Sequence, residues 1–264
     1  MRIEKRWEDL ELNDDFLFAK VMRDKHICMR LLEKLLHIKI KDIVYLEEQK
    51  TIDIDLNAKS IRLDVYVEDG DRVFNLEMQT TRQKELPRRS RFYQGLIDMN
   101  IIEKGESYSK LKESYVIFIC TFDPFGKGKP QYSFENICHE DLELALNDGT
   151  KKIFFNSTAY NKAGDEDVRD FLKYVNGEPS DNPFVKEIET KIVQVKTNKE
   201  WRQEYMTLLM REQEIRDETR EEAIKVLVRS LKSFNIPNDA IVEQLIKNYH
   251  LTRDEAKAYV KMTD

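Results

Sequence analysis

Residues 62–80 read RLDVYVEDGDRVFNLEMQT, and this stretch decides both the fold and the chemistry expected of the chain. Apolar and polar residues alternate on both sides of Asp69-Gly70-Asp71-Arg72, which predicts two antiparallel strands joined by a tight turn. A two-residue loop at Gly70 and Asp71 would place Asp64 directly opposite Glu77, because the register of a hairpin follows from its loop. Each strand then turns one apolar row toward the core: Leu63, Val65 and Val67 on the first, Phe74, Leu76 and Met78 on the second.

The opposite face of this hairpin carries Asp64, Glu77 and Gln79. Cross-strand partners have Cβ atoms about 4.5–5.5 Å apart, and two full charges at about 5 Å repel by roughly 3 kcal/mol at an effective dielectric near 20. A divalent cation would relieve this repulsion, because Mg²⁺ binds hard oxygen ligands through one or two carboxylates and keeps waters for substrate phosphates. The alternative is a solvated strand face on which Arg62 pairs diagonally with Glu77.

Asp64 is followed, after a dozen residues, by Glu77-Met78-Gln79. This spacing resembles the core of the PD-(D/E)XK nuclease superfamily, with Gln79 in the place of the usual lysine. Five segments together resemble the recombination-promoting nuclease family, a transposase-like family, over residues 8–160. They are Asn13-Asp14-Asp15-Phe16, Arg62-Leu63-Asp64-Val65, Leu76-Glu77-Met78-Gln79, Arg91-Phe92-Tyr93-Gln94 and Lys104-Gly105-Glu106-Ser107-Tyr108.

The resemblance implies an α/β, restriction-endonuclease-like mixed sheet flanked by helices, and metal-dependent DNA cleavage linked to bacterial recombination, mobile elements or phage defence. Asp64, Glu77 and the Met78 carbonyl would bind Mg²⁺, with Mn²⁺ or Ca²⁺ as alternatives. Gln79 can orient a water by hydrogen bonding, but it stabilises negative charge less than a lysine does. The resemblance therefore implies weak or tightly conditional activity.

A first helix is expected from about Asp14 to Leu36, with Asn13 as its amino-terminal cap and two aspartates complementing the dipole. In the family, an acidic residue from this helix approaches the metal. The resemblance places Asp14 and Asp15 in that role, with Glu33 as a substitute.

A basic patch of Arg82, Lys84, Arg88, Arg89 and Arg91 falls within ten residues, opposed by Glu85 alone. It covers the start of an expected helix with Pro87 in its first turn, and phosphate contacts by Arg and Lys supply most sequence-independent DNA affinity. Gln94 lies on the same helical stripe as Arg91 and is a candidate second-shell or substrate contact. A solvated charged surface, and a surface glutamine, are the alternatives.

One or two strands are expected over Ile43–Glu48 and Thr51–Leu56, and further strands at Tyr115–Phe122 and Lys152–Phe155. Gly105 is expected to end the basic helix, and Tyr108 to pack in the core. The nuclease-like domain would span residues 1–175 and a turn-rich loop residues 176–184. Residues 185–264 would form a helical extension with a terminal helical hairpin, for which self-association is preferred over DNA reading. Nine of the twelve residues in 211–222 are charged, so this segment is either a solvated bridging helix or part of a weak coiled coil.

Bulk composition fits an enzyme of the cytoplasm. The chain has 264 residues and 41% hydrophobic content, which is enough for a core, and its net charge of −6 does not exclude DNA binding by a local patch. Three widely spaced cysteines argue against a disulfide scaffold or a cysteine zinc site. No signal peptide or membrane span is expected.

Three functions are compatible with this sequence. The first is a Mg²⁺-dependent deoxyribonuclease. The second is a non-catalytic nucleic-acid or protein-binding module on the same scaffold, and the third makes the helical tail the functional part and the sheet domain its scaffold.

Overall fold

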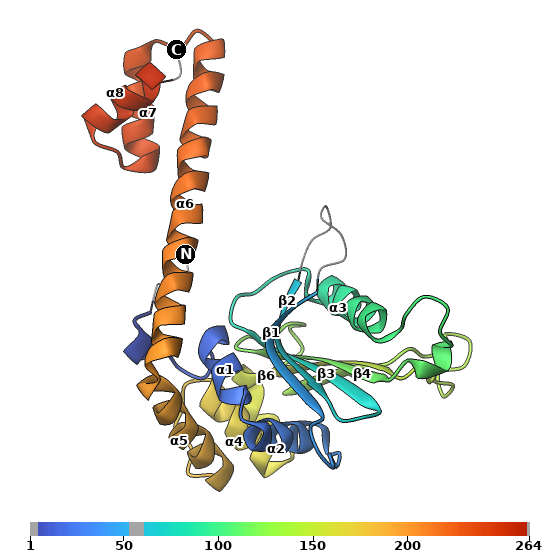
Figure 1. The fold of residues 1–264 in the computed structure, drawn as a ribbon. Coiled ribbons are helices and arrows are strands. Elements are labelled where there is room, and N and C mark those ends of the chain that lie inside the picture. Colours follow the sequence, from blue (N-terminus) through green and yellow to red (C-terminus); the bar gives the residue numbers. More distant parts are fainter. Residues whose placement is uncertain (1–4, 53–60, 263–264) are drawn as a thin grey trace. The chain divides into compact units, whose positions relative to one another are not determined.

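A mixed sheet lies at the centre of the compact unit Lys5–Trp201 in a computed structural model that describes residues 5–52 and 61–262 (Figure 1). Six strands form it in the order β1-β2-β3-β4-β6-β5 within these residues. Their bounds are β1 (Tyr45–Ile52), β2 (Ile61–Glu68), β3 (Arg72–Gln79), β4 (Glu113–Cys120), β5 (Gln131–Phe134) and β6 (Thr150–Asn156).

Strands β1, β2 and β3 pair antiparallel, β3, β4 and β6 pair parallel, and β5 pairs antiparallel at the edge. Every residue of β4 from Ser114 to Cys120 is buried, as expected of a near-continuous apolar run in a central parallel strand. The expected mixed α/β sheet with helices on both faces is thereby confirmed.

The β2–β3 hairpin has the expected two-residue loop. The Asp69 amide donates to the Arg72 carbonyl at 3.1 Å, and the Asp69 carboxylate pairs with the Arg72 guanidinium. Gly70, at φ +87°, occupies the loop position that needs a positive φ, which glycine adopts without steric cost. The two-residue loop therefore sets the register of the hairpin.

Helices cover both faces of the sheet (Figure 1). Helix α3 (Leu86–Ile101) packs on one face, over a cluster that includes Tyr66, Val73, Phe118 and Phe154. The other face carries α1 (Asp15–Met22), α2 (Lys25–Leu36), α4 (Glu166–Val175) and α5 (Pro183–Thr197). Short 3₁₀ helices lie at Trp7–Asp9, Tyr108–Lys110 and Ser157–Lys162.

The single first helix expected over 14–36 is wrong, because the structure has two helices there. The Asp24 carboxylate accepts hydrogen bonds from the amides of His26 and Ile27 at 3.1 and 3.3 Å. Asp24 thereby acts as the amino-terminal cap of α2 and starts a new helix after Arg23. Apolar periodicity continues across the break, and it concealed this cap in the sequence.

Other boundaries also differ from expectation. Of the one or two strands expected over 43–48 and 51–56, the structure has one, β1, and residues 53–56 lie outside the described chain. Helix α3 ends at Ile101, and Gly105, at φ +91°, lies in a turn beyond it. Tyr108 is 83% exposed and not in the core, and the four-residue edge strand β5 was too short to anticipate.

The expected loop at 176–184 connects α4 to α5 inside the unit Lys5–Trp201. The chain divides into its two compact units between Trp201 and Arg202. Helix α5 belongs with the sheet, and the Trp7 indole donates to the Lys196 carbonyl at 3.0 Å near its end.

The second unit contains the expected terminal helical hairpin, α7 (Asn238–Tyr249) and α8 (Arg253–Met262). Both helices pack on α6 (Lys199–Ser233), through a cluster that includes Ile224, Val228, Ile241, Leu245 and Val260. A two-helix hairpin buries too little surface to be stable alone, so α6 supplies the rest of this small core. Among the described residues, none of the helices is both long and apolar enough to cross a membrane.

Candidate functional site

Asp64 and Glu77 meet at the point where the β2–β3 ladder ends. Paired residues run to Val65 opposite Leu76, and one further step in this register sets Asp64 opposite Glu77. The Asp64 amide donates to Glu77 Oε1 at 3.2 Å, and the Met78 amide donates to Asp64 Oδ2 at 3.0 Å. Each carboxylate therefore accepts from a backbone amide of the other strand, and both occupy one gap.

Helix α3 covers this face of the hairpin, so the interpretation as a solvated strand face is wrong. Glu77 is 3% exposed, Asn75 is fully buried and Gln79 is 7% exposed, whereas Asp64 is half-buried. The diagonal pairing of Arg62 with Glu77 falls on a side chain outside the described residues. The pair is thus closed at Glu77 and reaches solvent on the Asp64 side.

Burial has the largest effect on the pKa of Glu77. Burial first, and then the negative charge of Asp64, raise the pKa of Glu77 well above its ordinary value. The amide of Asp64, the charge of Arg89 and the Asn75 amide group act in the opposite direction but do not cancel the effect. The Asn75 Nδ2 donates to Glu77 Oε1 at 3.1 Å. The folded chain therefore stores unfavourable free energy whenever Glu77 is ionised.

The donor set fits a hard divalent cation. Carboxylates of Asp64 and Glu77 supply oxygen ligands that Mg²⁺ prefers, and a site of one or two carboxylates leaves positions for water and phosphate. In an antiparallel pair, the N–H and C=O of one residue point toward the same neighbour. The Met78 amide points toward Asp64, so its carbonyl lies on the same side of the strand. These three groups can share one ion.

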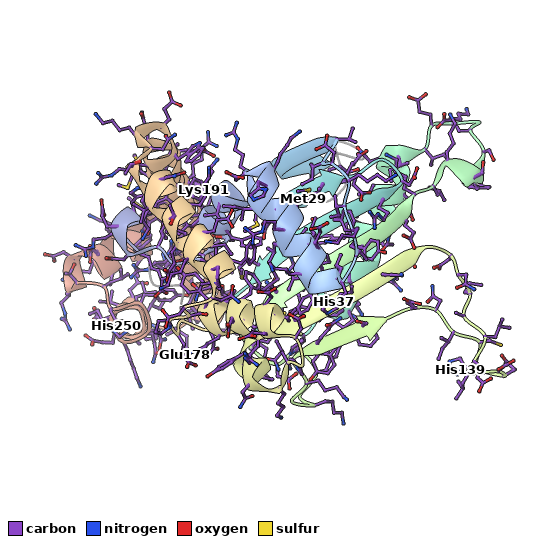
Figure 2. All side chains as sticks on the ribbon, turned by 90° about the horizontal axis from the view of Figure 1, so that it is seen from below. Met29, His37, His139, Glu178, Lys191 and His250 are labelled. Atoms are coloured by element: carbon purple, nitrogen blue, oxygen red, sulfur yellow. The ribbon has the colours of Figure 1, made fainter. Side chains whose placement is uncertain are left out.

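Histidines and clustered acids elsewhere do not offer an alternative. No group of three or more His, Cys, Asp and Glu side chains suited to a metal occurs in the described part of the chain. His37 ends α2 in a left-handed conformation, and His139 lies on the segment between β5 and β6 that projects from the sheet (Figure 2). His26 Nε2 lies 3.4 Å from the Glu187 carboxylate.

Gln79 has hydrogen-bond partners within the protein at both ends of its amide. Its Oε1 accepts from Arg89 Nη1 at 2.9 Å, and its Nε2 donates to the Thr81 carbonyl at 2.8 Å. These bonds use one of the two lone pairs of Oε1 and one of the two N–H groups of Nε2. The water-orienting role expected of Gln79 stays a prediction.

Arg89 points inward, unlike the rest of the basic patch. Its side chain is 29% exposed, and Nη2 lies 3.6 Å from Glu77 Oε2. The same nitrogen donates to the Tyr93 hydroxyl at 2.6 Å, while Nη1 donates to Gln83 Oε1 at 2.7 Å. Burial, followed by the charge of Glu77, raises the pKa of Tyr93 to about 12, so this phenol stays protonated near neutral pH.

The other members of the basic patch face solvent. Arg82, Lys84, Arg88 and Arg91 are exposed. Arg88 Nη1 lies 3.4 Å from the exposed Glu85 carboxylate, and the Arg82 guanidinium lies 5.6 Å from the Phe122 ring centroid. Exposed pairs of this kind contribute little stability, so these cations can be recruited by a phosphate at small cost.

Gln94 is not a surface residue. It is 5% exposed, and its Nε2 donates to the hydroxyl of Ser114 on β4. Its Oε1 is buried without a partner. Ser114 is adjacent to Val73 in the sheet register, whereas Glu77 is adjacent to Phe118, four residues further along β4. Gln94 therefore bonds to β4 in this structure, and a role as a substrate contact or as support for the site stays a prediction.

The acidic residues of the first helix take structural hydrogen bonds. Asp14 Oδ2 accepts from the Glu11 amide at 2.7 Å and from Lys5 Nζ at 3.0 Å. Asp15 Oδ1 accepts from the Phe16 amide at 2.8 Å. Helix α1 packs on the sheet face opposite to the one that carries Glu77. Participation of Asp14 or Asp15 in chemistry stays a prediction.

Glu33 also has a structural partner. Its Oε1 accepts from the Ile40 amide at 3.0 Å, which anchors the segment leaving α2.

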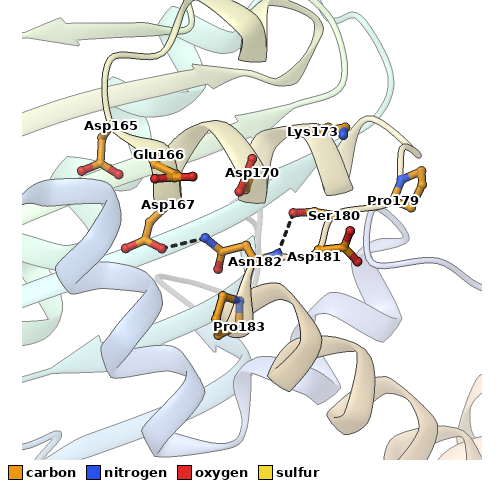
Figure 3. Close-up of a pocket in the computed structure, with 10 residues that line it drawn as sticks. All are labelled: Asp165, Glu166, Asp167, Asp170, Lys173, Pro179, Ser180, Asp181, Asn182 and Pro183. Atoms are coloured by element: carbon orange, nitrogen blue, oxygen red, sulfur yellow. Dashed lines mark hydrogen bonds between the residues drawn. The ribbon is translucent and has the colours of Figure 1, made fainter.

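A pocket of about 560 Å³ lies at the start of α4 and the loop before α5 (Figure 3). Its lining is Asp165, Glu166, Asp167, Asp170, Lys173, Pro179, Ser180, Asp181, Asn182 and Pro183. Asn182 Nδ2 donates to Asp167 at 2.9 Å, and the Asn182 amide donates to the Ser180 hydroxyl at 3.2 Å. An acidic pocket repels phosphate, and none of its lining residues belongs to the β2–β3 hairpin. The pocket is therefore separate from the carboxylate pair and is unsuited to bind a phosphate.

The sequence did not predict two of the contacts at the site. Asn75 precedes Glu77 by two residues, so the period of a strand already placed it on the same face. Arg89 and Tyr93 are four residues apart, so the period of a helix placed them on one stripe. What the sequence lacked was the docking of α3 onto β3, which brings these two stripes together.

Comparison with known protein families matches residues 13–223 to the PD-(D/E)XK nuclease family transposase. No curated protein and no solved structure matches the chain. The family match spans both the β2–β3 hairpin and α3, and nucleases of this superfamily generally use divalent metal ions.

Replacement of Glu77 by glutamine should stabilise the chain when no divalent ion is present. A carboxyl whose folded pKa is raised contributes stability that is present below its unfolded pKa and is lost as pH rises through the folded value. Urea unfolding in EDTA should therefore show Glu77→Gln more stable by roughly 1–3 kcal/mol at pH 8, the usual scale for an incompletely satisfied buried group. The gain should shrink toward pH 5. A difference that does not change with pH would contradict the assignment.

Proposed function

We propose that the chain, which belongs to the PD-(D/E)XK nuclease family transposases, is a metal-dependent DNA endonuclease. The observation that carries the proposal is the reciprocal bonding of Asp64 and Glu77 across two strands, with Glu77 buried beside a cationic group. Like charges held in so dry a place are costly to the fold, and a cation-binding function accounts for them.

In this proposal Asp64, Glu77 and the Met78 carbonyl hold a divalent ion, Mg²⁺ by preference, with Mn²⁺ and Ca²⁺ as alternatives. The bound ion would polarise a phosphate and lower the pKa of a water. Burial of Glu77 excludes bulk water from one side of the site, and the half-buried Asp64 leaves the other side open to a phosphodiester. Asp15 stays in the proposal as an acidic contribution from α1, as does Asp14, although Asp14 binds Lys5.

The four exposed cations, Arg82, Lys84, Arg88 and Arg91, would hold the DNA backbone beside the carboxylates. They follow β3 directly and lie on or just before α3, whose inner face covers Glu77. Phosphate contacts of this kind position the nucleic acid without reading its sequence. The biological setting that we propose is bacterial and cytoplasmic DNA cleavage linked to recombination, mobile elements or phage defence. Three free cysteines, two of them buried, are compatible with that reducing compartment.

A catalytically weak or inactive module that acts by binding is the second candidate. The specific observation that favours it is the amide at position 79, whose oxygen is bound to Arg89 where the superfamily pattern has a lysine. Cleavage assays separate the two candidates.

Purified chain should nick supercoiled plasmid in the presence of Mg²⁺ or Mn²⁺ and not in EDTA. The isosteric variants Asp64→Asn and Glu77→Gln should lose at least about 100-fold in rate, because they remove the charged ligands and retain the shape of the site. Asp71→Asn is the matched control, since Asp71 is an exposed carboxylate in the turn of the same hairpin. Equal nicking by all four proteins, or none by the wild type, would defeat the enzyme proposal.

Arg88→Ala and Arg91→Ala should weaken DNA binding without regard to sequence. Each lost phosphate contact should reduce the slope of log affinity against log salt by about 1. Fluorescence anisotropy with a labelled duplex at several salt concentrations measures this slope. Lys41→Ala, which removes an exposed cation outside the patch, should leave it unchanged. An unchanged slope in the arginine variants would place DNA elsewhere.

Self-association through the C-terminal helices completes the proposal. Met210 and Ile215 of α6 are each 63% exposed within a highly charged stretch, where a second copy could cover them. Light scattering of the full chain should give the mass of a dimer, and Met210→Lys combined with Ile215→Lys should give 31.5 kDa. Glu218→Lys is the control. A wild-type mass of one chain would contradict this part.

A further inference from the structure

We infer that Arg89 supplies the positive charge that position 79 lacks, and that Gln79, Gln83 and Tyr93 serve to hold its guanidinium against Glu77. This inference rests on the proposed nuclease function and adds a positioning residue to it. It also removes Arg89 from the set of DNA-binding residues.

The guanidinium is fixed by protein groups on two sides. Nη1 donates to Gln79 Oε1 at 2.9 Å and to Gln83 Oε1 at 2.7 Å. Nη2 donates to the Tyr93 hydroxyl at 2.6 Å and lies 3.6 Å from Glu77 Oε2. Each terminal nitrogen has two N–H groups, so three of the four donate to protein oxygens, while Glu77 lies at ion-pair distance, beyond a hydrogen bond. With one terminal N–H left over, the two terminal nitrogens cannot together clamp a DNA phosphate.

Two aromatic rings complete the enclosure. The guanidinium carbon lies 5.3 Å from the centroid of Tyr93 and 5.7 Å from that of Phe118 on β4. Both distances fall within the range of cation–π attraction. A guanidinium does not lose its proton in proteins, so the charge is permanent where a lysine would titrate when buried. The structure therefore sets a constant cation beside the carboxylate pair.

Position 79 explains why a cation is needed here. A lysine at this place would project from β3 toward the face that carries Glu77, because the two residues are separated by one strand period. Glutamine cannot carry the charge, but its oxygen can accept from a guanidinium that arrives from α3. Preorganised charge beside a reacting phosphate is commonly the largest electrostatic contribution to such reactions. Gln79 thus holds Arg89 in place as a hydrogen-bond acceptor.

The neighbouring arginine gives the contrast. Arg88 is one residue away on the same helix, yet its side chain is 79% exposed and pairs with Glu85. Arg89 is 29% exposed and faces the sheet. One turn of α3 therefore divides the basic patch into an outer part for the DNA backbone and one inner cation for the site.

The test uses the full chain with Arg89→Gln, Arg89→Lys, Arg89→Gln combined with Gln79→Lys, and, as the control, Lys41→Gln, which removes an exposed cation outside the basic patch. Single-turnover nicking of plasmid and Mn²⁺ titration by calorimetry are measured on each protein. Arg89→Gln should cleave at least about 10-fold more slowly and bind Mn²⁺ within about threefold of wild type, because charge at the reacting phosphate is lost and the oxygen ligands remain. The combined variant should recover most of the lost rate, whereas Lys41→Gln should cleave at the wild-type rate.

The outcomes are distinguishable. Wild-type cleavage by Arg89→Gln overturns this inference and leaves the nuclease proposal standing. Parallel loss of cleavage, Mn²⁺ binding and melting temperature, without recovery by lysine at position 79, also overturns it and makes Arg89 a structural residue. A wild-type chain that neither binds Mn²⁺ nor nicks DNA overturns the proposed function itself, and the inference falls with it.

Discussion

The repulsion between Asp64 and Glu77 is the constraint on which the rest of the site depends. Two carboxylates about 5 Å apart repel by roughly 3 kcal/mol at an effective dielectric near 20, and burial of Glu77 adds its own desolvation cost. The nearby polar groups offset part of this repulsion. Backbone amides of both strands, the Asn75 side chain and the Arg89 guanidinium all point at the pair. These contacts reduce the cost without removing it, since the pKa of Glu77 remains raised by burial and by Asp64. A site that still lacks positive charge after its own protein has contributed is suited to bind a cation.

Helix α3 has to satisfy two demands with one inner face. Leu96 and Ile97 bury apolar surface on β4 and β6, while Arg89 and Tyr93, nearer the amino terminus, cover the carboxylates. The apolar end holds the helix in place, and this allows the polar end to keep a charged group in a dry position that would be unfavourable alone. The outer face is then left to exposed arginines. Packing and charge placement therefore lie at different positions along the inner face of the helix, and the proposed DNA contact lies on its outer face.

The sequence predicted those features that depend on local rules. The period of two and the Asp-Gly turn were sufficient for the hairpin and its register, and the long apolar run was sufficient for β4. It failed where a local signal was overridden or concealed. Asp24 divides the first helix by a cap that the apolar period spans without interruption, and Gln94 is buried by a sheet that its helical stripe could not reveal. Whether the polar face of the hairpin is solvated stayed open, because no sequence rule states which helix will cover it. The inward turn of Arg89 belongs to the same class, since it depends on α3 docking over β3.

Carrying the charge on α3 instead of on β3 changes what the site depends on. A lysine at position 79 would be held by the strand itself, at the buried end of β3. Arg89 is in place only while α3 is seated, because its partners Gln79 and Tyr93 come from both elements. Any event that shifts the amino-terminal turns of α3 would withdraw the cation from Glu77 and leave the strand pair intact. Exposed arginines lie on the same turns, so in the proposed function a DNA backbone bound there would also fix that segment. Under that proposal, substrate binding and completion of the charged site are linked through one helix end, and a chain without the usual lysine would confine its chemistry to bound DNA.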